Sequence, residues 1–407
     1  MLKNLLLLAF SLFFFGNIFA FGALYIFTGE NMYGEGYARY KATLEKAKQD
    51  ICHVPHPFLG QLNCDDMPVD QPISKGEPLL RMASESTAEK PIRVLVLGGS
   101  VAAHLSKNVS SNKVIPPEVA YNGQSLGYEQ ILQTVLNAHF DTDRFVVDNA
   151  ALPGGKQPQQ LFKLHYLLML GERYDIVINV DGFNEIALPL IENRALGNHV
   201  AYPRSYSKLV ESASTARSSA CLVRANDYAR NTSWHPLSEV AHLVFIKWCH
   251  RAVELEGLGA NNPIATVSGY TKADEQAVVE EEVALWQQAT QAIAKLAPVY
   301  DFAYIHVIQP NQYVAGSKSL SEEEKEKYLA YDHYGAPIRN HYHKLDFNTW
   351  PTPEQAVLLD LRHVFHNRAE TLYRDACCHL NNKGMALLSE AIAKKAEQVF
   401  MQELEEE

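Results

Sequence analysis

The middle and the end of the chain alternate short aliphatic runs with longer segments in which apolar residues recur at helical spacing. The aliphatic runs are rich in Val, Ile and Leu, as in strands buried on both faces, and span residues 91–97, 144–149, 175–180 and 302–308. The segments with helical spacing span residues 128–139, 157–170, 275–296 and 383–402. This alternation predicts right-handed βαβ units and an α/β fold, a three-layer α/β/α sandwich with a central parallel sheet.

The N-terminal run of residues 4–28 carries no charged side chain and follows Lys3. A helix needs about 20 apolar residues to cross the hydrocarbon core of a membrane, and this run is long enough. A cleaved signal peptide has a shorter apolar region before a small-x-small site, and the nearest such triplet, 18–20, lies inside the run. The sequence therefore predicts an uncleaved signal anchor, a transmembrane helix over residues 1–28. A cleaved signal peptide and a buried helix are the alternatives.

This anchor sets the expected compartment of the rest of the chain. Lys3 and the amino terminus favour the cytoplasmic side, so the remainder should be extracytoplasmic, and periplasmic if the source is a Gram-negative bacterium. Residues 29–89 are predicted to form a stem and an irregular linker, because 50–89 are rich in Pro, Asp, Ser and Gly. The main domain is predicted over residues 90–407, with a helical insertion at about 191–265.

Composition and charge narrow the classes of function. Hydrophobic residues make up 47% and charged residues 20% of the 407 residues, an ordinary balance for a folded globular chain. The formal net charge is −11 and no cluster of Lys and Arg interrupts it, so nucleic acid is not an expected partner. The expected partners are a small-molecule, glycan or lipid substrate and, through the N-terminal helix, a membrane.

Six cysteines fit an exported chain, in which disulfides can form: Cys52, Cys64, Cys221, Cys249, Cys377 and Cys378. Proximity along the chain favours the pairs Cys52–Cys64 and Cys221–Cys249, although sequence does not fix connectivity. The adjacent Cys377 and Cys378 can pair with each other, pair with other cysteines or stay free. One of them as a reactive nucleophile is a further alternative, which an oxidising compartment disfavours.

Two groups of residues suggest metal binding, and neither has a diagnostic spacing. The first, which matches no common structural zinc site, consists of Cys52, His53, His56 and Cys64. The second, which fits a substrate-facing or surface loop better than a metal site, consists of His333, His341 and His343 with Asp332 and Asp346. We therefore expect no metal ion and no cofactor.

Chemically active residue types follow the predicted strands. Ser100 ends the first strand, Gly154 lies in the turn after the second, and Asn184 lies just past the third. Asp375 and His379 precede the last predicted helix. Because ligands of open α/β sheets bind beyond the carboxyl ends of the strands, these five residues are expected to meet in one site.

Four sequence blocks in this order resemble the SGNH/GDSL hydrolases, a family named for Ser, Gly, Asn and His. Residues 96–100 (VLGGS) resemble the nucleophile block in its GGS variant, and residues 149–154 (NAALPG) resemble the glycine block. Residues 182–185 (GFNE) are similar to the GxND block, with Glu in place of the usual Asp. Residues 375–379 (DACCH) resemble the closing Asp-x-x-His block, and the whole resemblance covers most of 91–401.

The resemblance implies an SGNH-hydrolase or flavodoxin-like sandwich that acts as a serine esterase or acyl hydrolase on an acetyl or acyl ester of a glycan or lipid. Ser100 would be the nucleophile, His379 its base, and Asp375 the residue that orients the imidazole and stabilises its charged form. The backbone N–H groups of Ser100 and Gly154 and the side-chain amide of Asn184 would form the oxyanion hole, each contributing about 3 kcal/mol.

One departure from the family concerns the spacing of the closing block. The family places Asp three residues before His, whereas Asp375 lies four residues before His379. Either the loop accommodates one extra residue, or another group, such as a backbone carbonyl, orients His379.

Each residue also has a structural interpretation. Residues 98–100 (GGS) after a strand fit a turn with a helix cap or the start of a dinucleotide fold, although the full G-x-G-x-x-G pattern is absent. Gly155 competes with Gly154 for the oxyanion position. Asn184 suits a helix cap, and His379 suits a packing role beside the last helix.

Two other functions fit the same blocks. If a sugar hydroxyl replaced water as the acceptor, the same triad would make the protein a carbohydrate O-acyltransferase. The extra residue between Asp375 and His379 and the large insertion favour instead a non-catalytic glycan-binding or assembly module on the same fold. A fluorophosphonate probe, which labels an activated serine, separates this last alternative from the two enzymes.

Overall fold

The computed structural model describes most of the chain after residue 89. The described residues are 90–105, 131–204, 274–329, 331–349 and 356–405, with short segments at 11, 13–22, 25, 53–56, 60–63, 119–121, 124–126, 240–241, 244–245, 247–248, 351 and 353–354. The chain divides into two compact units, Met1–Pro55 with Lys208–Thr266, and His56–Ser207 with Val267–Glu407. The sheet and the candidate site both belong to the second unit.

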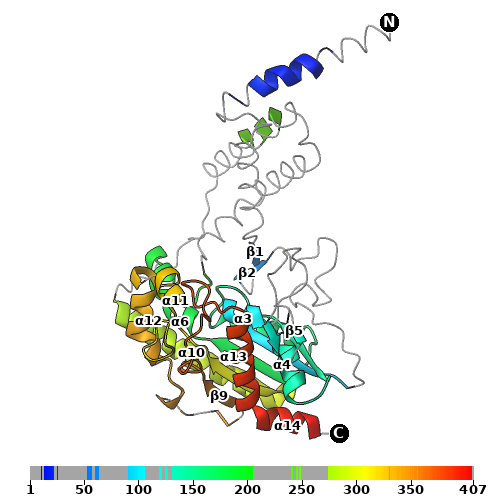
Figure 1. Ribbon diagram of the computed structural model, residues 1–407, viewed down its shortest axis with the longest axis vertical. Coiled ribbons are helices and arrows are strands. Elements are labelled where there is room, and N and C mark those ends of the chain that lie inside the picture. The colour runs from blue at the N-terminus through cyan, green and yellow to red at the C-terminus, as the bar shows by residue number, and fades with distance from the viewer. Residues whose placement is uncertain are drawn as a thin grey trace. The chain divides into compact units, whose positions relative to one another are not determined.

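This second unit is built on a five-stranded sheet in which every strand runs parallel to its neighbours (Figure 1). In the spatial order β6-β3-β7-β8-β9, the strands are Phe145–Asn149, Ile92–Gly98, Ile176–Asp181, Ala303–Ile308 and Ala356–Asp360. The central strands β3 and β7 are buried almost throughout, which explains their continuous aliphatic sequence. The parallel α/β fold expected from the hydrophobic pattern is confirmed.

Helices cover both faces of the sheet. Successive residues of a strand point to opposite faces, so Val94 and Val96 of β3 pack into one apolar core while Leu95 and Leu97 pack into the other. On the first face, α13 packs beside α4 (Figure 1), whereas α5 and the C-terminal part of α10 cover the second. The helices named here are α3 (Ser100–Leu105), α4 (Ile131–His139), α5 (Gln159–Met169), α10 (Glu275–Tyr300), α13 (Asn382–Lys395) and α14 (Glu397–Glu405).

Shorter elements surround this core. The strands β4 (Val119–Tyr121) and β5 (Gln124–Leu126) form an antiparallel pair, and β1 (His53–His56) and β2 (Gly60–Asn63) precede the sheet in the chain. The remaining helical elements are α6 (Phe183–Leu188), η4 (Pro189–Asn193), η5 (Arg194–Leu196), α11 (Glu322–Lys327), η6 (Tyr331–Gly335), α12 (Ala336–His341), η7 (Tyr342–Lys344) and η8 (Phe347–Thr349).

Three elements differ from the sequence predictions. The sequence analysis does not predict the edge strand β9. Its residues 356–359 (AVLL) form an aliphatic run, but this run is shorter than those of the predicted strands and is flanked by proline and polar residues. The last helix, predicted as one segment, is divided into α13 and α14 at Ala396, whose ψ is 15°. The helix α10 continues to Tyr300 through Pro298.

Much of the predicted domain organisation concerns residues outside those that the structure describes. None of the described residues belongs to a helix that is both long and apolar enough to cross a membrane. Within the predicted anchor, residues 13–22 are helical, and most of the other residues of 1–28 lie outside the described residues. The same is true of the predicted stem at 33–48 and of most of the insertion at 191–265. The compartment and the domain boundaries remain predictions.

The described cysteines carry free thiols. Cys377 is half-buried and Cys378 is buried, and neither forms a disulfide. The predicted pairs Cys52–Cys64 and Cys221–Cys249 lie outside the described residues.

Candidate active site

Ser100 lies at the carboxyl end of the central strand β3 and begins α3. Two glycines precede it, and the second, Gly99, has a steric role. A Cβ at Gly99 would overlap the side-chain amide of Asn184, which comes from the start of α6 beside the end of β7. The Gly-Gly-Ser sequence therefore brings an amide donor directly beside the serine.

The structure brings Ser100, His379 and Asp375 into one hydrogen-bonded chain. The imidazole Nε2 of His379 lies 2.6 Å from the Ser100 Oγ, and its Nδ1 lies 2.6 Å from the Asp375 Oδ2. Both distances are short for hydrogen bonds of these types. With the proton on Nδ1, His379 donates to the carboxylate and accepts from the serine hydroxyl, the arrangement that a general base needs.

The loop of residues 375–379 accommodates the extra residue between Asp and His. The Asp375 Oδ1 accepts hydrogen bonds from the backbone N–H groups of Cys377 (2.8 Å) and His379 (3.3 Å), which folds the loop around the carboxylate. Cys378 has a φ of +64°, a left-handed conformation that reverses the chain just before His379. A bridge between Tyr373 and Leu380 closes the base of this loop. Of the two alternatives for the spacing, the structure therefore has the accommodating loop.

Side chains of the segment that follows β8 form hydrogen bonds that support this loop. The side-chain amide of Gln312 donates to the Asp375 carbonyl at 2.9 Å, and the Tyr313 hydroxyl donates to the Ala376 carbonyl at 2.9 Å. The side-chain amide of Gln309 lies 3.0 Å from the Cys378 Sγ. Side chains of the segment after β8 thus hold the loop that carries the carboxylate and the imidazole.

Electrostatics in the loop favour a carboxylate and two neutral thiols. Burial alone would raise the pKa of Asp375, but the hydrogen bond and charge of His379, together with two backbone N–H donors, outweigh burial and lower this pKa below its usual value. Burial raises the pKa values of Cys377 and Cys378, and the negative charge of Asp375 adds to the effect. Neutral thiols are poor nucleophiles, so the cysteine alternative is disfavoured.

The predicted oxyanion donors gather around the turn after β6. The Asn184 side-chain amide donates to the Gly155 carbonyl at 2.8 Å, which leaves its second N–H for another acceptor. Gly155 uses its own N–H on the Leu152 carbonyl at 2.7 Å. Within the described residues, the backbone N–H groups of Ser100 and Gly154 have no hydrogen-bond partner. The geometry therefore favours Gly154 over its neighbour as the backbone donor.

Position 154 excludes larger residues for two reasons. Its φ of +75° is strained for any residue with a Cβ, and an added Cβ would lie 2.8 Å from the Cδ of Arg204. The Arg204 guanidinium is half-exposed and forms a two-pronged ion pair with Glu192, at 3.0 and 2.7 Å. The Arg204 side chain thus lies against the turn at Gly154.

Glu185 ties the segment after the glycine turn to the segment that carries Asn184. Its buried carboxyl group accepts from the Gly182 N–H at 2.7 Å and from the Gln157 N–H at 3.2 Å. Burial, followed by the negative charge of Asp181, raises its pKa well above the usual value. The group therefore favours its neutral form, which adds no negative charge behind the oxyanion donors.

Below Glu185, buried polar side chains connect the ends of β7 and β8. Asp181 Oδ1 accepts from the Trp286 indole N–H at 3.0 Å and lies 2.9 Å from the His306 Nε2. Its Oδ2 accepts from the Asn179 amide at 2.7 Å. These bonds satisfy a carboxylate that immediately precedes the Gly182–Glu185 block, and so fix the start of that block.

A buried ion pair anchors the same end of the glycine turn, one residue before Gln157. Lys156, which follows the two glycines, is fully buried; its ammonium donates to the Val200 carbonyl and lies 3.5 Å from Glu282 of α10. Burial raises the pKa of Glu282 to about 7, partly offset by Lys156. Sequence analysis did not identify this pair, because nothing in a Lys after a Gly-Gly turn indicates burial.

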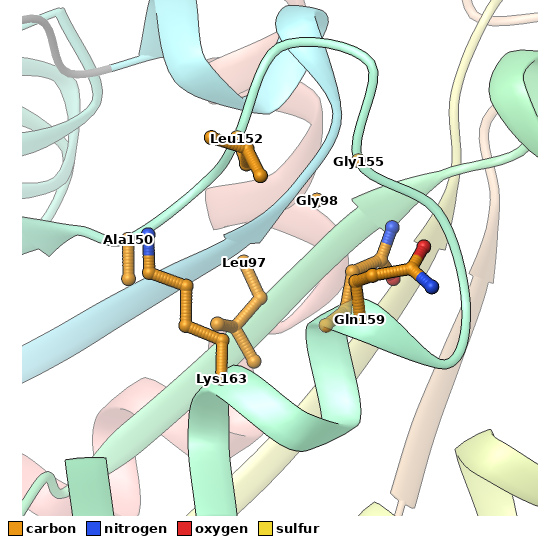
Figure 2. Close-up of a pocket in the computed structure, with 8 residues that line it drawn as sticks. Leu97, Gly98, Ala150, Leu152, Gly155, Gln159 and Lys163 are labelled. Atoms are coloured by element: carbon orange, nitrogen blue, oxygen red, sulfur yellow. The ribbon is translucent and has the colours of Figure 1, made fainter. Parts of the chain in front are cut away.

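A small pocket lies beside the glycine turn. It has a volume of only about 10 Å³, about that of one water molecule, between the end of β3, the turn and the start of α5. In Figure 2, Gln159 and Lys163 extend from α5 toward the turn. Ser100, His379 and Asn184 are not among the residues that line it. Its apolar walls, Leu97 and Ala150, belong to the core behind the sheet, so this pocket is no substrate site for the triad.

No metal site is evident among the described residues, where no three His, Cys, Asp or Glu side chains are placed to bind one ion. His341 of the predicted loop group instead lies 2.7 Å from a carboxylate oxygen of Glu275. His333 and His343 are exposed.

Comparisons with known proteins are consistent with this fold and go no further. No family model matches the chain, and a comparison with curated proteins finds no relative. Among solved structures, the chain is similar to a GDSL-like lipase from Parabacteroides merdae, with 10% identity, a TM-score of 0.35 and coverage of 77% of this chain and 99% of that one. It is also similar to a catalytic mutant of an acetylxylan esterase from Geobacillus stearothermophilus, with 11% identity, a TM-score of 0.31 and coverage of 76% and 95%. Such low similarity says nothing about the substrate, so the functional argument rests on this chain's own side chains.

The contact between Gly99 and Asn184 generates the first prediction. In Gly99→Ala, the new methyl group should displace the Asn184 amide while Ser100 and His379 keep their hydrogen bond. Loss of one oxyanion donor lowers kcat by about 10²- to 10³-fold, so the ester hydrolysis that the sequence predicts should fall by that amount in this variant. Asn184→Ala should show the same loss, and the double variant should be no worse than either. Wild-type kcat in Gly99→Ala would show that the amide has no catalytic role.

The ion pair of Lys156 and Glu282 generates a second prediction, about stability and pH. Because the folded-state pKa of Glu282 is raised, its contribution to stability is complete below about pH 4.5 and is lost as the pH rises through about 7. We compare the free energies of unfolding of the wild type and of Glu282→Gln. The stability advantage of the wild type over the variant should fall by on the order of 3 kcal/mol as the pH rises across this window. Urea unfolding at several pH values measures it. Glu280→Gln, at an exposed glutamate on the same helix, is the matched control.

Proposed function

We propose that this protein is a serine hydrolase that cleaves ester bonds through an acyl-enzyme at Ser100. The observation that carries the proposal is the chain of two short hydrogen bonds from Ser100 through His379 to Asp375. These residues come from positions 100, 375 and 379 of the chain. Packing alone does not require a hydroxyl, an imidazole and a carboxylate to align in this order, so the alignment indicates a catalytic role.

Acylation follows from the geometry. As the Ser100 Oγ attacks the ester carbonyl, its proton passes to the His379 Nε2, and the new imidazolium remains hydrogen-bonded to Asp375 through Nδ1. The carbonyl oxygen becomes an oxyanion that the N–H groups of Ser100 and Gly154 and the Asn184 amide stabilise. The intermediate then breaks its C–O bond to the alcohol, which takes the proton from His379.

Deacylation repeats these steps with water. His379 removes a proton from a water molecule, whose oxygen attacks the acyl carbonyl, and the Ser100 Oγ leaves with the proton that His379 held. Both half-reactions need Asp375 to stay ionised, which its lowered pKa favours. The half-exposed Ser100 and the exposed edge of His379, whose side chain is 20% exposed, admit both an ester and a water molecule.

The proposed substrates are acetyl or acyl esters of a glycan or lipid outside the cytoplasm. The uncharged N-terminal run supports this compartment, since an anchor there would place the hydrolase at a membrane surface. The same triad would transfer the acyl group to a sugar hydroxyl if such a hydroxyl entered in place of water. Product analysis with and without an oligosaccharide acceptor distinguishes the two reactions.

The proposal predicts that an activated serine can be labelled. The full chain should react covalently with a fluorophosphonate probe and hydrolyse p-nitrophenyl acetate, and Ser100→Ala should abolish both. Asp375→Asn should lower kcat by on the order of 10⁴-fold, because the imidazole would adopt the wrong tautomer. Labelling is measured by intact mass, and turnover by p-nitrophenolate release.

A matched control is Ser319→Ala, at an exposed serine remote from the triad in sequence, which should keep wild-type labelling and turnover. A wild-type chain that stays unlabelled while folded would disprove the hydrolase and favour the non-catalytic module. Labelling that persists in Ser100→Ala would assign the reactive group to another residue.

A further inference from the structure

A second histidine lies against the imidazole of the triad. His104 comes from α3 four residues after Ser100, so both side chains leave the same face of that helix. The His104 and His379 rings are perpendicular, with an interplanar angle of 87° and centroids 5.3 Å apart. The His104 side chain is buried at 8% exposure, so its position is fixed by packing. Such edge-to-face contacts favour one ring orientation over others.

Arg374 links this second histidine to the loop that carries His379. Its guanidinium Nη2 lies 3.0 Å from the His104 Nε2, and its backbone N–H donates to the His379 carbonyl at 3.0 Å. Arginine only donates hydrogen bonds, so the His104 Nε2 is the acceptor and carries no proton. His104 is therefore a neutral imidazole with its proton on Nδ1.

We propose that His104 and Arg374 form a clasp that positions His379 for catalysis without touching the substrate. The proposal rests on the proposed hydrolase. The clasp joins α3, which carries the nucleophile, to the 375–379 loop, which carries the base and its carboxylate. Both are positioning residues, because they act through His379.

The need for a clasp follows from the reaction itself. Once Ser100 is acylated, its oxygen can no longer donate a proton to the His379 Nε2, so the hydrogen bond that aligns the ring in the free enzyme is lost. Asp375 still holds Nδ1, but one hydrogen bond leaves the ring free to rock about that bond. The His104 contact does not involve a reacting atom and persists through both half-reactions.

The clasp also keeps a positive charge close to the site but out of contact with the base. The neutral His104 ring contacts the Arg374 guanidinium through its Nε2 and the His379 ring edge-to-face. Direct contact of the guanidinium with His379 would oppose formation of the imidazolium, since like charges repel at short range. Among the described residues, Ser100 and His104 from α3 and Asp375 from its own loop contact the His379 side chain.

Three variants separate the two parts of the clasp. His104→Phe keeps an aromatic ring but removes the acceptor for Arg374, and His104→Gln keeps an acceptor but removes the ring. Arg374→Met removes the donor. The measurements are kcat and KM for p-nitrophenyl acetate, the rate constant of fluorophosphonate labelling, and the thermal midpoint of the full-length chain.

We expect His104→Phe and Arg374→Met each to lower kcat and the labelling rate by about 10-fold or more, with KM and the thermal midpoint close to wild type, because a small misplacement of a reacting group is costly. The double variant should be no slower than the slower single variant, since the two side chains act as one unit. His104→Gln should restore part of the loss seen in His104→Phe. The controls His139→Phe on α4 and Arg194→Met on η5 should match wild type.

Each outcome decides a different point. Wild-type kcat in folded His104→Phe and Arg374→Met would overturn the clasp and leave the hydrolase intact. A loss that tracks the fraction of unfolded protein would reduce the pair to a structural contact. If the wild type itself is not labelled, the proposed function fails, and the downfield proton resonance of His379 Nδ1–H then tests the clasp: an unchanged resonance in Arg374→Met overturns it, and a shifted one supports it.

Discussion

The parallel register of three neighbouring strands is the constraint on which the candidate site depends. Gly98 of β3 pairs with Val180 of β7, and Val96 pairs with Asn149 of β6, so the three strands end at one edge of the sheet. The serine, the glycine turn and the asparagine each follow closely after one of these strands. This register therefore brings them together with no long loop between them. Only the imidazole and its carboxylate arrive from a distant part of the chain, and the loop that carries them needs additional supports.

Most of this arrangement could be predicted from the sequence, and there are physical reasons why the rest could not. The strands β3, β6, β7 and β8 are buried and aliphatic, so their pattern is strong, whereas the half-exposed edge strand β9 has only a short aliphatic run, 356–359, flanked by proline and polar residues. Ser100, Asn184 and His379 were found because they follow strands or precede a helix. His104 could have been found from its helical spacing to Ser100 only if α3 had been predicted, and a six-residue helix has too few positions for a periodic signal. Arg374, Gln309 and Gln312 act through contacts across hundreds or tens of residues, which spacing does not reveal.

Buried charge beneath the site connects stability with function. Asp181, Glu185 and Glu282 are all buried within the same unit, and their mutual repulsion and desolvation would destabilise a fully ionised cluster. The fold relieves this in different ways: Asp181 has three hydrogen-bond partners, Glu185 favours its neutral form, and Glu282 has Lys156 beside it. Two of these groups hold the segment that follows the glycine turn: Glu185 accepts from the Gln157 N–H, and Glu282 lies beside Lys156. Substitutions in this cluster should therefore change activity through the position of the turn as well as change stability.

The spacing of the closing block shows how a departure from a family pattern can preserve the chemistry. With four residues from Asp to His, a regular turn would carry the carboxylate past the imidazole. Here the Asp375 carboxylate instead caps its own loop, and Cys378 adopts a left-handed conformation that costs a non-glycine residue of order 1 kcal/mol. Hydrogen bonds from Gln312 and Tyr313 to the Asp375 and Ala376 carbonyls stabilise the strained loop from outside. The loop with its extra residue thus requires support from the segment after β8. A substitution in that segment would first change the distance between Asp375 and His379.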